Sequence, residues 1–255
     1  MRVTAVPPVV LIHGACSQPA HLDAWREAFR AAGYACTAPA LPGHAPGERR
    51  ALRGLGFDDY VLAMRQAVSD TARKPILVGH SMGALIARLL AAEERARALV
   101  LVAPLPAGRV PVTAHALPFV PLVAPFVVAG LPFRPTRGAV RRLALHDLPR
   151  IEQDAIADGF VAESGRVYRQ LALGHAHVGR RTVRCPVLVI HGSADRLVPV
   201  HVGEGIARKH GAALDIVDGA GHWLVAPSLV PRVAQAVLRW LDAAEADRGA
   251  DRQLR

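Results

Sequence analysis

Residues 79–83 read Gly-His-Ser-Met-Gly and place a serine between a short apolar run and a helix-forming run. Residues 75–78 read Pro-Ile-Leu-Val before this pentapeptide, and residues 84–90 read Ala-Leu-Ile-Ala-Arg-Leu-Leu after it. The order predicts a strand, a sharp turn and a helix, with the hydroxyl of Ser81 at the bend and clear of the sheet. The two glycines fit such a turn, because side chains there would collide where the strand and the helix converge.

Short runs rich in Val, Ile and Leu alternate with helical patterns along most of the chain, as is typical of a parallel sheet covered on both faces. We expect strands within residues 9–12, 34–38, 76–78, 99–102, 187–190 and 214–217. We expect helices around residues 22–31, 57–72, 82–93, 201–210 and 229–244. The predicted fold class is therefore α/β, with a mostly parallel six-stranded sheet and helices on both faces.

The alternation of strands and helices stops between residues 107 and 181. We therefore predict a core formed by residues 1–106 and 182–255, with residues 107–181 inserted as a cap. A cap over the carboxyl edge of the sheet would line an apolar pocket. The alternative is an insertion that packs on the core without forming a pocket.

Residues 116–133 of the predicted cap are apolar and uncharged. Prolines at four positions would disrupt a membrane-spanning helix there, so we expect no transmembrane span. These prolines are Pro118, Pro121, Pro125 and Pro132. We expect the phenylalanines of this stretch, Phe119, Phe126 and Phe133, to line the substrate pocket.

The formal net charge is +10, and all but two of the 31 basic residues are arginine. The arginines are scattered, without the interleaved aromatic residues that a nucleic-acid groove uses, so we expect no nucleic-acid partner. Weak contact with a membrane surface stays open, as does the choice between a monomer and a homodimer.

Three cysteines, Cys16, Cys36 and Cys185, are an odd number at unrelated spacings. They resemble neither a disulfide framework nor pairs of metal ligands. The first residues contain no apolar run long enough for a secretory signal, and we expect a cytoplasmic location.

An acid and a base follow two later strands of the predicted sheet. Asp195 lies in the loop after the strand at residues 187–190, and His222 ends a glycine-rich loop after the strand at residues 214–217. A serine hydroxyl becomes a nucleophile when a histidine takes its proton, and that histidine needs a carboxylate to fix its tautomer. We therefore predict a catalytic triad of Ser81, Asp195 and His222, in the chain order expected for this architecture.

Two of these residues have simpler interpretations. Asp195 could cap the helix that follows it, and His222 could be an ordinary surface histidine. The triad is favoured because the three residues follow three separate strands in one order.

Negative charge on a tetrahedral intermediate needs hydrogen-bond donors. The backbone N–H of Met82 begins the helix after the serine, where the helix dipole also favours negative charge. The second donor is expected in the loop after the first strand, which reads His-Gly-Ala-Cys from residue 13. We predict the N–H of Ala15, with that of Cys16 as the alternative.

Further short segments accompany the elbow: Val-Val-Leu-Ile-His-Gly-Ala-Cys at residues 9–16, Trp25, Ala-Gly-Tyr at 32–34, Leu-Pro-Gly-His at 41–44 and Gly-His-Trp at 221–223. With these, nearly the whole chain resembles the α/β-hydrolase superfamily, in its serine-triad esterase and lysophospholipase-like branch. The resemblance implies an α/β-hydrolase sheet, a nucleophile elbow, an oxyanion hole and carboxylesterase or lipase-like activity. The cap matches no family that we can name.

We therefore expect a serine hydrolase that cleaves carboxylic esters of small to medium apolar substrates through an acyl-enzyme, with no metal or cofactor. Cys16 and Trp223 are expected in the pocket beside the three phenylalanines. The alternatives are a lyase, C–C hydrolase or cyclase on the same scaffold in a biosynthetic pathway, or a ligand-binding protein with low turnover.

Overall fold

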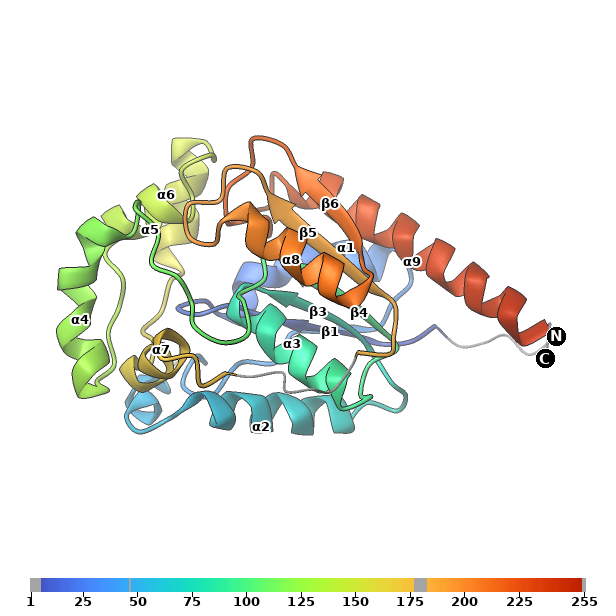
Figure 1. Ribbon diagram of the computed structural model, residues 1–255, viewed down its shortest axis with the longest axis horizontal. Helices are drawn as coiled ribbons and strands as arrows, with labels where there is room; N and C mark the ends of the chain where they lie inside the picture. Colours follow the sequence, from blue (N-terminus) through green and yellow to red (C-terminus); the bar gives the residue numbers. More distant parts are fainter. Residues whose placement is uncertain (1–5, 46, 177–182, 254–255) are drawn as a thin grey trace.

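The computed structural model describes residues 6–45, 47–176 and 183–253. Its centre is a sheet with the strand order β2-β1-β3-β4-β5-β6, in which every neighbouring pair is parallel (Figure 1). The strands are β1 (Val9–Ile12), β2 (Cys36–Thr37), β3 (Ile76–His80), β4 (Ala98–Val102), β5 (Val187–Gly192) and β6 (Ala213–Val217). The predicted α/β fold class and the six predicted strands are confirmed.

Helices cover both faces of the sheet, because each central strand is apolar on both sides. On β1, Val9 and Leu11 belong to one buried cluster, with side chains of α1 (Asp23–Ala31) and α9 (Val230–Gln253). Val10 and Ile12 belong to the other cluster. The helices of the core that contribute to it are α2 (Phe57–Ser69), α3 (Met82–Ala92) and α8 (Val200–His210), and α7 (Gly165–Ala172) adds Val167 and Leu171. All five predicted helices are present, and α9 continues beyond residue 244.

The segment between β4 and β5 forms a helical layer at one end of the sheet (Figure 1). It contains η3 (Leu117–Phe119), α4 (Val120–Ala129), α5 (Arg137–Leu143), α6 (Arg150–Asp158) and α7 (Gly165–Ala172). Two further short 3-10 helices lie outside this segment: η1 (Pro19–Leu22) comes before α1, and η2 (Arg49–Leu52) comes before α2. We call residues 107–176 the cap segment. The remainder of the predicted cap, residues 177–181, lies outside the described residues.

Among the residues that the structure describes, no helix combines the length and the apolar composition needed to cross a membrane. The apolar stretch at residues 116–133 folds into η3 and α4, and α4 contains Pro125 and has no buried residue.

The turn between β3 and α3 brings a strand and a helix very close together. Ser81 has φ of 56° and ψ of −119°, a left-handed conformation that is uncommon for residues with a side chain. A Cβ at Gly79 would overlap the backbone of Gly83 and Ala84. A Cβ at Gly83 would overlap the carbonyl oxygens of Ile12 and His13. Both glycines are thus required by the packing of α3.

We predict that Gly83→Ala lowers the free energy of unfolding by at least about 1–3 kcal/mol, because backbone atoms must move to admit the methyl group. The control is Gly138→Ala in α5, where a Cβ meets no atom within 4 Å. That change should be neutral or stabilising by up to about 1 kcal/mol, since alanine favours helix over glycine. Denaturant unfolding of both variants checks the difference, and equal stabilities would contradict the packing argument.

Candidate active site

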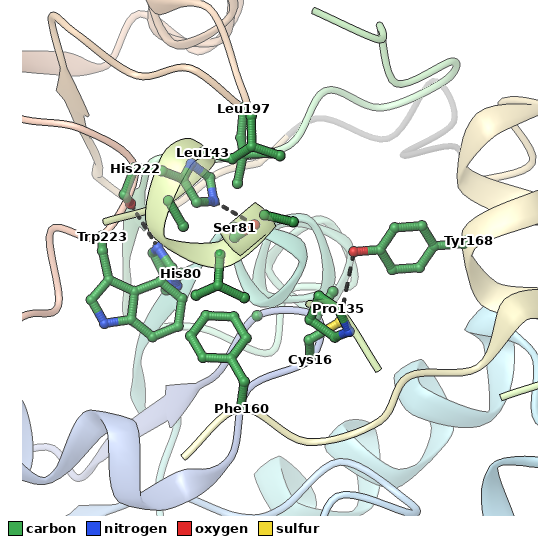
Figure 2. Close-up of a pocket in the computed structure, with 15 residues that line it drawn as sticks. Cys16, His80, Ser81, Pro135, Leu143, Phe160, Tyr168, Leu197, His222 and Trp223 are labelled. Carbon is green, nitrogen blue, oxygen red and sulfur yellow. Dashed lines mark hydrogen bonds between the residues drawn. The ribbon is translucent and has the colours of Figure 1, made fainter. Parts of the chain in front are cut away.

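Ser81, His222 and Asp195 form a continuous chain of hydrogen bonds at the carboxyl edge of the sheet. The Ser81 hydroxyl donates to Nε2 of His222 at 3.0 Å (Figure 2). Nδ1 of His222 in turn donates to Oδ2 of Asp195 at 2.7 Å. The three residues follow β3, β6 and β5 respectively, so the parallel sheet delivers all three to one place. The structure therefore brings together the three residues that the sequence predicted as a triad.

The carboxylate of Asp195 is held by its own loop as well as by His222. Its Oδ1 accepts the backbone N–H groups of Leu197 and Val198 at 2.8 and 2.9 Å. Nε2 of His191 lies 3.3 Å from Oδ2. Burial opposes ionisation, but the neighbouring His222 and these hydrogen bonds outweigh it and hold the pKa of Asp195 well below its usual range.

The interpretation of Asp195 as a helix cap is only partly matched by this geometry. Helix α8 begins at Val200 with Pro199 at its N-cap position, so Asp195 closes the turn before the helix and does not cap the helix itself. One carboxylate oxygen serves that turn, and the other faces His222.

His80, the residue before Ser81, forms a hydrogen bond with the backbone of the loop that carries His222. Its Nε2 donates to the carbonyl oxygen of His222 at 3.0 Å (Figure 2). Burial, together with the neighbouring His222, lowers the pKa of His80 to about 3, so the ring is neutral. The sequence analysis gave His80 no role, and its position inside the elbow was the one available signal.

The two predicted oxyanion donors, Met82 and Ala15, belong to two segments near Ser81. Met82 is the first residue of α3, where an N–H has no preceding helical carbonyl to bind. Ala15 lines the cavity beside Ser81. The N–H of Cys16, the alternative donor, instead donates to Oε2 of Glu163 at 3.1 Å.

A cavity of about 120 Å³ opens onto Ser81 between the core and the cap segment. Cys16 and Trp223 line it, as the sequence predicted (Figure 2). Its other lining residues are Gly14, Ala15, His80, Ser81, Pro135, Ala139, Val140, Leu143, Ala144, Phe160, Tyr168, Leu197 and His222. Apolar side chains dominate this set, and α5 supplies a large share of them.

The prediction that Phe119, Phe126 and Phe133 line this cavity is wrong. Phe126 lies on α4 at the outer edge of the cap segment and is 42% exposed (Figure 1). Phe133 is buried, but it packs edge-on against Tyr168, with ring centroids 4.9 Å apart. Phe119 belongs to η3, which leads into α4.

The cap segment also holds the two loops that carry the acid and the base. Nε2 of His146 donates to the carbonyl oxygen of Ala194 at 3.0 Å. Oδ2 of Asp147 accepts the N–H of Gly221 at 2.8 Å. Sequence reasoning missed both contacts, because a His-Asp pair in a turn between helices carries no recognisable motif.

Among the described residues, no group of three or more His, Cys, Asp or Glu side chains is placed to hold a metal ion. The arrangement at Ser81 contains what acyl transfer needs, namely a hydroxyl, a base beside it, and a buried carboxylate behind the base.

Comparisons with known proteins agree with this fold. A pyrethroid hydrolase from Sphingobium wenxiniae (strain DSM 21828 / CGMCC 1.7748 / JZ-1) is 35% identical over 78 residues, which span 31% of this chain and only 28% of that relative. A pyrethroid hydrolase structure from Sphingobium faniae JZ-2 shares 24% identity with a TM-score of 0.71, covering 94% of this chain and 98% of its own. A methylesterase structure from Arabidopsis shares 15% identity with a TM-score of 0.73, covering 93% and 99%. Residues 9–236 match the family model described as "Alpha/beta hydrolase family", and the chain therefore belongs to that family.

Proposed function

We propose that this protein is a serine hydrolase that cleaves carboxylic esters of small to medium apolar substrates through an acyl-enzyme. The observation that carries the proposal is the unbroken chain of hydrogen bonds from Ser81 through His222 to Asp195, beside an apolar cavity. Membership of the alpha/beta hydrolase family supports a hydrolase, and the names of the similar proteins support an ester as the substrate class.

In this proposal Ser81 attacks the ester carbonyl while His222 takes its proton. Asp195 holds the proton on Nδ1 of His222, so that Nε2 is free to accept, and it stabilises the imidazolium that forms. The N–H groups of Met82 and Ala15 would stabilise the negative oxygen of the tetrahedral intermediate. His222 then returns the proton to the leaving alcohol, and the same steps with water release the acid.

The cavity sets the proposed size and polarity of the substrate. Its volume is about 120 Å³, below the several hundred Å³ typical of sites for drug-sized ligands. Val140 and Leu143 of α5 form part of the wall, and Trp223 lines the same cavity. A short apolar acyl group fits these surroundings better than a long or charged one.

We predict that Ser81→Ala abolishes both hydrolysis of p-nitrophenyl acetate and covalent labelling by a fluorophosphonate, since both reactions need the hydroxyl. Ser228→Ala, which changes an exposed serine bonded to Glu152, is the control and should keep both activities. A labelled Ser81→Ala variant would contradict the assignment of the nucleophile. A labelled wild type without ester turnover would favour the lyase, cyclase or C–C hydrolase alternatives, and an unlabelled wild type would favour a ligand-binding protein.

We predict that Asp195→Asn lowers kcat by about 10³–10⁴-fold. The asparagine oxygen can keep the N–H groups of Leu197 and Val198, but its amide nitrogen then faces Nδ1 of His222. The imidazole must turn to the tautomer that is protonated on Nε2, which cannot accept the serine proton. Steady-state kinetics and thermal melting of the variant check this, because a purely structural Asp195 would lower the melting temperature and leave kcat unchanged.

We predict that Leu143→Ala extends the range of acyl chains that the enzyme accepts. Each methylene buried in the cavity contributes about 0.8 kcal/mol until the space is full, so selectivity should climb with chain length and stop at a limit. Removing the Leu143 side chain should move that limit to longer chains. Phe126→Ala is the control on exposed α4 and should leave the limit in place. Values of kcat/KM for p-nitrophenyl esters of graded length decide, and identical profiles for all three proteins would contradict the cavity assignment.

A further inference from the structure

Glu163 carries a carboxylate in the cap segment, two residues before α7, and the residue is 0% exposed. Four donors converge on it, three of them from distant parts of the chain. Oε1 accepts the hydroxyl of Tyr60 at 2.6 Å and the N–H of Ser164 at 2.7 Å. Oε2 accepts the N–H of Cys16 and Nε2 of His44, each at 3.1 Å. The side chain thus joins the cap segment to α2 and to the loops after β1 and β2.

The pattern of donors requires an acceptor oxygen at both ends of the side chain, as the carboxyl group of a glutamate provides. Each oxygen faces one backbone N–H, Ser164 on one side and Cys16 on the other, and a backbone N–H cannot reverse its role. A glutamine of the same size would direct its own N–H group at one of these two donors.

His44 balances the charge of this buried carboxylate. Its Nδ1 lies 3.0 Å from the carbonyl oxygen of Pro42, and its Nε2 lies 3.1 Å from Glu163. Both partners are acceptors, so both ring nitrogens donate and the ring is an imidazolium. Burial alone would lower the pKa of His44, but the hydrogen bond and the charge of Glu163 raise it above its usual value. The pair therefore holds a fixed anion beside Cys16 without an uncompensated buried charge.

Both backbone polar groups of Cys16 form hydrogen bonds with the cap segment. Its N–H donates to Glu163, and its carbonyl oxygen accepts the N–H of Val161 at 2.9 Å. Its φ is 57°, a conformation that costs roughly 1–2 kcal/mol in a residue with a side chain. The two contacts from the cap segment hold the loop in this conformation.

Cys16 directly follows Ala15, the proposed oxyanion donor. On the other side of this donor, Gly14 packs so closely that a Cβ would lie 3.0 Å from Cβ of Ser81. Residues 14–16 are thus fixed between the nucleophile and Glu163. Because the N–H of Cys16 binds the carboxylate, it is not available to an oxyanion, and Ala15, which lines the cavity, carries the other predicted donor of this loop.

We propose that Glu163 is a positioning residue for the oxyanion hole: by accepting the N–H of Cys16, it fixes the loop so that the N–H of Ala15 faces the developing negative charge. This inference rests on the proposed esterase function and adds a residue of the cap segment to it. Glu163 acts through the backbone and touches neither the substrate nor Ser81.

The experiment compares Glu163→Gln with Tyr60→Phe. Both variants disturb the same carboxylate, but Tyr60→Phe removes a donor from Oε1 and leaves the contact between Oε2 and Cys16 intact. Active sites are counted by labelling with a fluorophosphonate. For p-nitrophenyl acetate, kcat is then expressed per labelled site, and KM is measured in the same assay. Inhibition by a short trifluoromethyl ketone, whose adduct places an oxyanion in the hole, is measured beside them, together with the melting temperature.

For Glu163→Gln we expect kcat per labelled site to fall about 10- to 100-fold with KM nearly unchanged, since a misplaced donor forfeits part of the about 10²–10³-fold that one oxyanion donor supplies. The ketone should bind more weakly by a similar factor. Tyr60→Phe should lower the melting temperature while keeping kcat per site. If Glu163→Gln does not fold, Glu163→Asp replaces it, because this variant keeps the charge beside His44 but withdraws the carboxylate from Cys16.

Wild-type kcat per site in a folded Glu163 variant would overturn the positioning role, as would an equal loss of kcat in Tyr60→Phe. Either result leaves the proposed function standing, provided that the wild type is labelled and hydrolyses the ester. A wild type that is neither labelled nor active would instead overturn the proposed function.

Discussion

The close approach of α3 to the end of β1 is the constraint on which the rest of the site depends. Gly83 lies against the carbonyl oxygens of Ile12 and His13, at a distance that no side chain would permit. This approach forces Ser81 into its left-handed turn and sets the loop after β1 directly beside it. Because the sheet is parallel throughout, the loops after β5 and β6 reach the same edge and bring Asp195 and His222 to Ser81.

The cap segment supports this edge from the outside. It contacts one loop through Glu163 and Cys16, a second through His146 and the carbonyl oxygen of Ala194, and a third through Asp147 and the N–H of Gly221. In each case a side chain of the insertion binds the backbone next to a residue of the site. The insertion therefore covers the cavity and also restrains the loops that form its floor.

The fold and the three residues at its centre were predictable because their signals are local. Buried parallel strands read as continuous apolar runs, and the elbow needs glycines at two fixed positions around Ser81. The pocket was not predictable in the same way. The stretch containing Phe126 is apolar all round, so its sequence does not indicate which side meets a neighbour, and α4 has no buried residue. Glu163 gave no signal at all, since its partner Cys16 lies 147 residues away along the chain.

In the proposed role of Glu163, the contacts that hold Cys16 link the wall of the cavity to the position of the oxyanion donor. A chimaera that takes its cap segment from a relative inherits a new cavity wall, but it also loses the carboxylate and the Val161 N–H that hold the loop after β1. We expect such an exchange to preserve catalysis only if the new cap segment also binds the N–H and the carbonyl oxygen at position 16, or if the loop after β1 is exchanged together with it. In the proposed role of Glu163, the insertion and the loop after β1 would have to be exchanged together, although Glu163 and Cys16 lie 147 residues apart along the chain.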